Sequence, residues 1–260
     1  MNILKRFFSA VNYLMILAEN TVLVWKGRKR IESYHNRYVG KRCFIVGNGP
    51  SLSVEDLEKI KGEISFGTHR IYHIFDKTKW RPQFYCAQDA RLINDEFERI
   101  SKIDVDPKMI AIMPFTRYQK IKGATYIKLN GEKFYPQLPK FSSDICKEIY
   151  EGFTVTYMSL QIAIYMGFSE IFLLGMDHSY SIEMNPDGSI KTTEGIKDHF
   201  SSDDVCTNVP QTYKSTLAYY AARKYADQHN VKIFNATRGG KLDVFERVDF
   251  DSLFTVEERT

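Results

Sequence analysis

The chain has 260 residues, of which 43% are hydrophobic and 26% charged, a composition that suits a folded protein with one sizeable core. Its formal net charge is +4, but residues 1–30 carry +5 and the rest of the chain −1. A nearly neutral body excludes a protein that binds nucleic acid through a general basic surface. The four cysteines have no C-x-x-C spacing, which argues against zinc and favours a reducing cytoplasmic compartment.

The N-terminal segment is mostly apolar from Ile3 to Trp25, and its polar residues recur on one side of a helix. Its longest stretch without a charge, Phe7–Ala18, is too short to cross a bilayer comfortably. Basic residues stand at both ends, Lys5 and Arg6 before this stretch and a cluster at 26–30 after it. Three interpretations remain open: a helix on an anionic membrane surface, a helix packed on the body or on another subunit, and a signal peptide without an evident cleavage site.

The most informative stretch is Cys43–Ser53, where a short apolar run ends in a glycine-rich turn. Phe44–Val46 predicts a buried strand, and Ser51 or Ser53 can cap a helix that runs to about Lys61. The stretch matches neither the dinucleotide fingerprint, which needs a third glycine, nor the P-loop, which needs a Lys before Ser or Thr.

This turn is a candidate anion site. Gly47 and Gly49 allow the backbone to approach a ligand closely, and free N–H groups at the start of a helix favour a phosphate. Asn48 adds a side-chain amide that can bind a sugar or a base. A strand–turn–helix unit without a ligand is the alternative interpretation.

Beyond this stretch, strands and helices alternate along the chain. Further strands are predicted at 63–66, 83–86, 109–113, 125–129, 171–174 and 231–235, and further helices at 89–101, 154–166 and 211–229. Residues 130–149 are expected to be irregular, and the polar residues 179–210 form a loop long enough to be a functional lid. The pattern predicts an α/β protein with a single Rossmann-like, mostly parallel, doubly wound sheet, an N-terminal helix and a long lid loop.

Polar and glycine residues follow the predicted strands where each one ends. In doubly wound sheets ligands bind beyond the carboxyl ends of the strands, so we expect these residues to form one composite site. They are Gly47, Asn48, Thr68, His69, Arg70, Gln88, Asp89, Gly175, Asp177, His178, Asn235, Ala236 and Thr237.

Three of these residues have distinct chemical options. The fork of Arg70 suits a phosphate or a carboxylate, with a surface ion pair as the alternative. Asp89 and Asp177 can hold ribose hydroxyls, cap the following helix or bind a metal, and capping is favoured for Asp89 because a helical stretch follows it directly.

Two histidines are candidate acid–base groups because imidazole titrates near working pH. His178 follows a predicted strand, and His199 lies in the long loop beside Asp198, which either orients it or is solvated. Tyr157, Tyr180 and Tyr213 can donate to a phosphate or stack on a base, and a structural role is the alternative for each.

Four segments, VGNGPSL (46–52), GFTVT (152–156), the helix end at 162–167 that leads to EIFLLGMD (170–177), and NATRGG (235–240), carry a resemblance over roughly residues 40–245. They resemble bacterial proteins grouped by similarity to the archaeal 6-hydroxymethylpterin diphosphokinase (MptE-like), which are common among surface-polysaccharide genes. The first and third segments, in this order, are also similar to the bacterial CMP-sialic-acid sialyltransferases.

The similarity to the sialyltransferases implies roles for particular residues. The turn would contact CMP through Asn48, Gly49 and Ser51, while Thr154 and Thr156 would approach the donor. The full set implied for nucleotide binding is Gly47, Asn48, Gly49, Ser51, His69, Arg70, Gln88, Asp89, Thr154, Thr156, Gly175, Asp177, His178 and Tyr180.

The mobile lid of that family carries a histidine that deprotonates the acceptor hydroxyl, and His199 is the nearest match here. Asparagines that follow the second and third strands in the family are replaced here by about His69 and by Ala87-Gln88. Because of this departure, CMP-linked Kdo and nonulosonates are expected as donors alongside a CMP-linked sialic-acid-like sugar.

The resemblance therefore predicts a glycosyltransferase of surface-polysaccharide biosynthesis. It would move a sugar from a nucleotide-activated, preferably CMP-linked donor to a glycan or lipid-linked acceptor, with inversion, with His199 as general base and without a metal cofactor. The alternatives are a Mg-ATP-dependent pyrophosphokinase of the 6-hydroxymethylpterin type, which needs carboxylates for Mg²⁺, and a non-enzymatic nucleotide-binding accessory protein.

In this organisation residues 1–35 form an N-terminal amphipathic helix, which is a candidate membrane-surface anchor through residues 1–30. Residues 40–250 form the Rossmann-like, nucleotide-sugar-binding catalytic domain, with 179–210 as its lid. The protein is expected in the cytoplasm, with a peripheral position on the inner face of the cytoplasmic membrane as a second option. No nucleic acid is expected as a partner. The sequence leaves the oligomeric state open.

Overall fold

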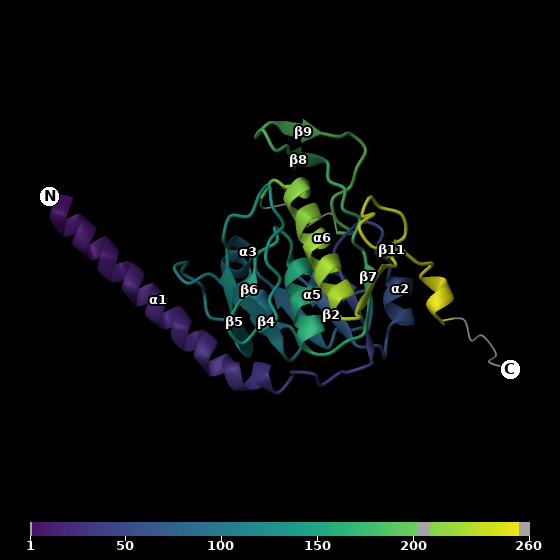
Figure 1. Cartoon of the computed structure of the whole chain (residues 1–260), viewed down its shortest axis with the longest axis horizontal. Helices are drawn as coiled ribbons and strands as arrows, with labels where there is room; N and C mark the ends of the chain where they lie inside the picture. Colours follow the sequence, from purple (N-terminus) through teal and green to yellow (C-terminus); the bar gives the residue numbers. More distant parts are fainter. Residues whose placement is uncertain (1, 202–207, 255–260) are drawn as a thin grey trace.

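The computed structural model describes residues 2–201 and 208–254, in which a parallel sheet of nine strands forms the centre (Figure 1). The strands of this sheet are β1 (Arg42–Val46), β2 (Ser65–Thr68), β3 (Phe84–Ala87), β4 (Lys108–Ile112), β5 (Ala124–Asn130), β6 (Ile149–Tyr150), β7 (Glu170–Leu174), β10 (Lys232–Asn235) and β11 (Glu246–Arg247). The helices are α1 (Asn2–Glu32), α2 (Val54–Lys59), α3 (Ala90–Asp95), α4 (Phe97–Lys102), α5 (Val155–Tyr165) and α6 (Thr212–Gln228), with 3₁₀ turns η1 (Ile71–Ile74) and η2 (Asp251–Phe254).

The order of the strands in the sheet is β11-β10-β7-β1-β2-β3-β4-β5-β6. From β1 the chain builds the sheet in one direction as far as β6, and then returns to place β7 on the other side of β1. The order therefore reverses between β1 and β7, which is the place where parallel α/β sheets leave a crevice for ligands.

Two hydrophobic clusters cover the two faces of this sheet. One contains the buried residues of α5 and α6, and the other contains those of α2, η1, α3 and α4. Strand β1 faces both clusters, which explains why its last four residues, Cys43–Val46, form one continuous apolar run rather than an alternating one. Figure 1 shows α5 and α6 side by side on one face, while α1 projects from the body.

Helix α5 is central to the side of the molecule that carries α6. Its residues from Val155 to Ala163 are all buried, including the polar Gln161. The carboxamide of Gln161 accepts hydrogen bonds from the N–H groups of Ser142 (3.1 Å) and Tyr150 (3.0 Å) and donates to the carbonyls of Tyr150 (3.0 Å) and Tyr157 (3.1 Å). One side chain thereby fixes β6 and the preceding loop against the helix.

The predicted fold class is confirmed, with differences at several boundaries. The predicted helix 89–101 is two helices, α3 and α4, because the chain leaves helical geometry at Glu96. Helix α2 ends before Lys61, since Gly62 adopts a left-handed conformation (φ 123°). The stretch predicted as irregular, 130–149, begins with the last residue of β5 and ends with the first of β6.

The predicted lid, 179–210, contains an antiparallel hairpin, β8 (Ile182–Met184) and β9 (Ile190–Thr192), which the sequence did not predict. Figure 1 shows this hairpin standing beyond the carboxyl edge of the sheet. Residues 202–207 of the predicted lid lie outside the described residues.

Replacing Gln161 with Leu should lower the free energy of unfolding by about 3 kcal/mol, because it leaves buried N–H and C=O groups of Ser142 and Tyr150 without partners. Urea denaturation followed by circular dichroism measures this loss. Ser159→Ala is the matched control: its buried hydroxyl donates to the carbonyl of Val155 one turn earlier, and its removal should cost roughly 1 kcal/mol or less. Equal losses in the two variants would contradict the role given to Gln161.

Candidate active site

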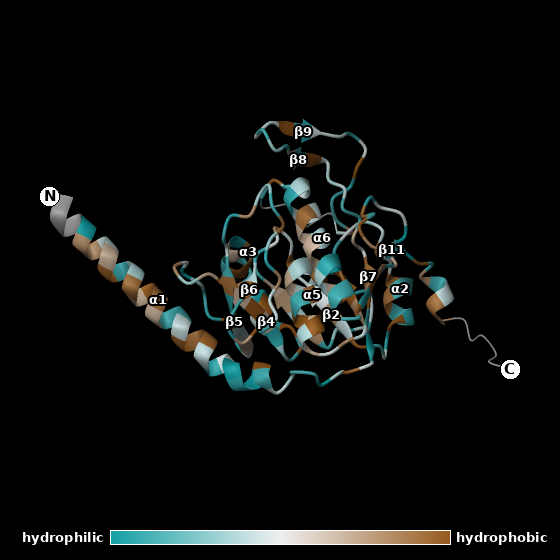
Figure 2. Ribbon diagram, viewed as in Figure 1, coloured by the Kyte–Doolittle hydropathy of each residue, from teal (hydrophilic) through white to brown (hydrophobic). Residues whose placement is uncertain are grey.

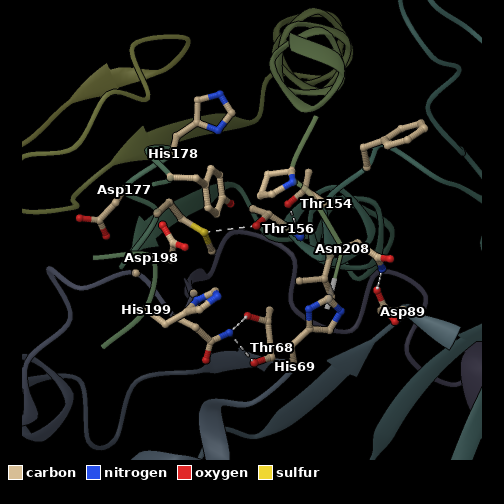
Figure 3. Close-up of a pocket in the computed structure, with 18 of the residues that line it drawn as sticks. Thr68, His69, Asp89, Thr154, Thr156, Asp177, His178, Asp198, His199 and Asn208 are labelled. Atoms are coloured by element: carbon tan, nitrogen blue, oxygen red, sulfur yellow. Dashed lines mark hydrogen bonds between the residues drawn. The ribbon is translucent and has the colours of Figure 1, made fainter. Parts of the chain in front are cut away.

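A cavity of about 520 Å³ lies over the place where the strand order reverses (Figure 3). Residues after β1, β2, β3 and β7, the first turn of α5 and parts of the lid line it. The structure thus brings together most of the predicted site residues: Gly47, Asn48, Gly49, His69, Arg70, Gln88, Asp89, Thr154, Thr156, Gly175, Asp177, His178, Tyr180 and His199 line the cavity. Other residues predicted for the site do not line it, namely Ser51, the three that follow β10 (Asn235, Ala236 and Thr237), Tyr157 and Tyr213.

The floor of the cavity is made by two turns that press against each other. The N–H groups of Gly47 and Gly49 donate to the carbonyls of Leu174 (2.8 Å) and Gly175 (2.9 Å). A Cβ atom on Gly49 would lie 1.8 Å from Oδ2 of Asp177, and one on Gly47 would lie 2.5 Å from the carbonyl oxygen of Gly175. The glycines are therefore needed for contact between the turns, and since both line the cavity, the approach of a ligand to their backbone stays a prediction.

Asp177 occupies the place where a phosphate was predicted at the start of α2. Its Oδ2 accepts hydrogen bonds from the hydroxyl (2.7 Å) and the N–H (3.4 Å) of Ser51. Ser53 caps α2 as predicted, accepting from the N–H of Asp56 (3.1 Å), but this helix start does not line the cavity. Burial raises the pKa of Asp177, while the two bonds from Ser51 oppose that shift.

Two residues that line the cavity, Asn48 and Gln88, each have a buried amide oxygen whose hydrogen-bonding capacity is unused. The NH₂ group of Asn48 donates to the carbonyl of Thr68 (2.9 Å), which fixes the direction of the amide. Among the described residues, Oδ1 of Asn48 and Oε1 of Gln88 are buried without a hydrogen-bond partner. Since a buried acceptor without a partner is costly, both oxygens favour a ligand that brings N–H or O–H groups.

The first turn of α5 faces the cavity from the other side. Oγ1 of Thr154 accepts from the N–H of Thr156 (3.3 Å) as the helix cap, and the hydroxyl of Thr156 donates to the sulfur of Met176 (3.2 Å). The N-terminus of this 11-residue helix carries a partial positive charge that suits an anion. The structure therefore offers α5, rather than α2, as the helix whose N-terminus can meet a phosphate.

Two predicted polar residues take part in contacts at the cavity wall. Asp89 caps α3 as expected, accepting from the N–H of Leu92 (2.9 Å), and its second oxygen accepts from the amide of Asn208 (2.8 Å). Arg70 forms an ion pair with Glu96, 3.6 Å between Nε and Oε1, and its side chain is only 11% exposed. The ion pair predicted as the alternative for Arg70 is thus present, largely buried beside the cavity.

The two candidate histidines lie in different environments. Figure 3 shows His199 on the same side of the cavity as Thr68 and His69, with His178 on the opposite side. Nε2 of His178 lies 2.8 Å from the hydroxyl oxygen of Thr216, and burial lowers the pKa of His178 to about 4. His178 is therefore neutral at pH 7 and is a weak base compared with an ordinary imidazole.

The lid reaches the cavity through contacts on either side of His199. The carboxylate of Asp198 accepts from the N–H (2.5 Å) and the hydroxyl (2.8 Å) of Ser181, so it is not merely solvated. The N–H of Phe200 donates to the carbonyl of Asn48 (3.0 Å), and the bond from Asn208 to Asp89 holds the far end of the lid. These contacts place His199 next to the glycine turn.

Glu151 is a cavity residue that the sequence analysis missed. It follows β6 directly, and among the described residues it has neither a hydrogen bond from its carboxyl group nor an ion pair. Burial raises its pKa, while nearby Lys214 lowers it and nearby Asp89 raises it further. One sequence feature could have indicated this residue: Glu151 stands immediately before the GFTVT segment (152–156). The strand β6 that precedes it was not predicted.

Other cavity residues were also missed. They include Phe153, Met184, Asn208, Val209, Pro210, Gln211 and Tyr219. Within the ranges 2–201 and 208–254, no group of three or more His, Cys, Asp or Glu residues is placed to hold a metal ion.

These observations define the class of protein: an α/β protein with a parallel sheet and a polar cavity over the place where the strand order reverses. The chain belongs to the MptE-like family: the family model described as "6-hydroxymethylpterin diphosphokinase MptE-like" matches residues 17–183. The match confirms the predicted family, starts within α1 and ends in the hairpin of the lid, whereas the sequence motifs placed it at about 40–245.

Among solved structures, the chain is similar to the MAf glycosyltransferase from Magnetospirillum magneticum AMB-1, with 17% identity and a TM-score of 0.49. The similarity covers 88% of this chain and 39% of that chain, so this protein spans well under half of that enzyme's length. No curated protein matches the sequence.

Glu151→Gln should raise the melting temperature at pH 7 by roughly 2 °C or more, and by much less at pH 4. The raised pKa means that the folded state keeps a proton that the unfolded state releases, so stability falls as pH rises above the unfolded value and stays lower beyond the folded pKa. Thermal unfolding at the two pH values measures the difference.

Glu148→Gln is the control, because the ammonium of Lys128 (2.7 Å) lowers the pKa of Glu148 and makes its charge stabilising. This variant should be less stable than the parent protein at pH 7. An effect of Glu151→Gln on the melting temperature that is independent of pH would contradict a partly buried carboxyl group with a raised pKa.

Proposed function

We propose that this chain is a glycosyltransferase of surface-polysaccharide or glycan biosynthesis that takes a sugar from a nucleotide-activated donor. The preferred donor is CMP-linked, carrying a sialic-acid-like sugar, Kdo or another nonulosonate, and the acceptor is a hydroxyl group of a glycan or of a lipid-linked glycan. The proposed location is the cytoplasm. Whether the protein also works at the membrane surface is a separate question, which concerns α1.

The observation that supports this function is the convergence of strand ends, helix N-terminus and lid on one polar cavity. Its volume of about 520 Å³ lies within the range of small-molecule and cofactor sites. The partnerless oxygens of Asn48 and Gln88 suit a ligand rich in amino and hydroxyl groups, such as a cytosine base and sugars.

In the proposed complex the phosphate of the donor faces the N-terminus of α5, where Thr154 and Thr156 lie. Asp177 accepts hydrogen bonds from ribose or sugar hydroxyls through the oxygen that Ser51 does not use. The nucleotide is thereby held at two points. Its leaving phosphate lies next to the partial positive charge of the helix N-terminus, which stabilises the phosphate more strongly as negative charge develops on it.

The proposed chemistry is an inverting displacement. Nε2 or Nδ1 of His199 takes the proton of the acceptor hydroxyl, the acceptor oxygen forms a bond to the anomeric carbon, and the bond from that carbon to the nucleotide phosphate breaks. The bonding electrons leave with the phosphate, and for a CMP-linked donor the product is CMP. His178 is less suited to the role of base, since burial holds its pKa at about 4.

The family's description supports a second candidate, a Mg-ATP-dependent pyrophosphokinase. Asp89 and Glu151 line the same cavity and are close enough for Asp89 to raise the pKa of Glu151. Two neighbouring carboxylates are a minimal arrangement for Mg²⁺ that also contacts substrate phosphates. The glycosyltransferase proposal needs no metal, and this difference separates the two experimentally.

The donor class is tested by thermal shifts with CMP, CDP, UDP, GDP and ATP, each with and without EDTA. CMP at about one hundred times its Kd should raise the melting temperature by roughly 5 °C or more, and EDTA should not change that shift. Gln88→Leu, which removes a cavity acceptor, should reduce the shift, whereas Gln119→Leu on an exposed loop should not. A shift produced only by ATP with Mg²⁺ would favour the kinase, and no response to any nucleotide would refute both.

His199→Ala should lower kcat for transfer by about 10²–10⁴-fold, the usual contribution of a general base, while leaving the CMP-induced thermal shift in place. His229→Ala is the matched control, because His229 follows α6 outside the cavity and stacks on Tyr225. An undiminished kcat in the His199 variant would remove this residue from the mechanism without affecting the proposed donor site.

A further inference from the structure

Helix α1 has two apolar faces, and only one of them meets the body. Ile16 and Ile31 are buried, and the amide of Asn20 donates to the carbonyls of Met113, Pro114 and Thr116 at 2.8–3.1 Å. A Cβ atom on Gly27 would lie 3.2 Å from the carbonyl oxygen of Tyr126, so the helix backbone lies directly against β5. The second half of α1 is therefore docked through one face.

The opposite face of α1 is apolar and exposed over about five turns. Its exposed residues are Phe7, Val11, Leu14, Met15, Val22 and Trp25, and we call this set the outward stripe. At 100° per residue they fall on one side of the helix, opposite Ile16, Asn20 and Gly27, and they span about 27 Å of axis. Leu14 is 64% exposed and Trp25 70%, and Figure 2 shows the brown residues along the part of α1 that projects from the body.

The charges at the C-terminal end of the outward stripe are mainly cationic, while the exposed Glu19 borders the middle of the stripe. Lys26 and Lys29 continue it at the C-terminal end and are exposed. Glu32, on the same side of the helix, is neutralised by Arg28 at 2.8 Å. An apolar stripe that ends in uncompensated lysines beside a tryptophan matches the interface of a bilayer with anionic headgroups.

We propose that the outward stripe of α1 lies in the surface of an anionic membrane, with its axis along the membrane plane. By length and composition the segment Arg6–Glu32 could cross a membrane. However, the docked half of the helix packs on protein, and the ten residues before Ile16 cover only about 15 Å, half the hydrocarbon thickness of a bilayer. The helix therefore lies on the membrane rather than across it.

A second copy of this chain is a poorer occupant of the outward stripe. A parallel pair of α1 helices would bring Lys26 and Lys29 against the same lysines of the other copy. This arrangement places like charges together, which costs affinity, whereas anionic lipid compensates these charges.

Flotation of the full-length protein with vesicles tests this inference. The protein should float with vesicles of 30% phosphatidylglycerol in phosphatidylcholine and bind pure phosphatidylcholine at least about tenfold more weakly. Leu14→Glu with Val22→Glu should abolish flotation, and Lys26→Glu with Lys29→Glu should remove the preference for anionic vesicles. Tyr220→Glu is the matched control, because it places the same charge at an exposed aromatic residue of α6.

Each variant is compared only if its melting temperature stays near that of the parent protein. Failure to float, or flotation unchanged by Leu14→Glu with Val22→Glu, would overturn the inference. A dimer in light scattering that this double variant dissolves, without vesicle binding, would assign the stripe to a second copy. Retention in the membrane after an alkaline carbonate wash would overturn the surface position in favour of a spanning helix. None of these results depends on the proposed enzymatic activity.

Discussion

The contact between the turn after β1 and the turn after β7 is the constraint on which the rest of the site depends. Gly47 and Gly49 have no space for a side chain, and the carboxylate of Asp177 lies against Gly49 while Ser51 holds it. Because β1 and β7 are neighbours on opposite sides of the reversal in strand order, this contact closes the floor of the crevice. The residues after β2 and β3 and the first turn of α5 then form walls around that floor.

Backbone strain is concentrated around the same cavity. Among the described residues, five that are not glycine have positive φ, and three of these, His69 (φ 44°), Phe153 (φ 56°) and His178 (φ 52°), line the cavity. Each such conformation costs on the order of 1–3 kcal/mol and persists only where the surrounding structure enforces it. The strain identifies these walls as parts of the protein whose geometry is maintained at the expense of stability, which is typical of a binding site.

The sequence was sufficient to predict the structure wherever local residue patterns determine it. The central strands are buried on both faces and appear as continuous apolar runs, and the polar residues after them could be assigned to one edge of the sheet. The two-residue β6 and the exposed hairpin β8–β9 carry no such pattern, so they were not predicted. The break between α3 and α4 was missed for the same reason, since a single residue at Glu96 interrupts an otherwise helical stretch.

The roles of individual site residues depended on partners far away in the chain. Ser51 was assigned to a ligand because its true partner, Asp177, is 126 positions away. Glu151 was overlooked because its burial follows from the packing of β6 beside the cavity, which no short motif encodes. Sequence patterns could therefore locate the site, while the contacts that fix each side chain required the coordinates.

The position of α1 also protects the sheet. Strand β5 pairs with β4 along five residues, but β6 pairs only with Leu129 and Asn130 on its other side. The backbone of α1 near Gly27 covers the remaining edge beside Thr125 and Tyr126. A chain shortened by this helix would expose an unpaired strand edge, which promotes aggregation between molecules. The docked side of α1 therefore has a structural role of its own, and the helix cannot be lost without leaving this edge of the sheet open.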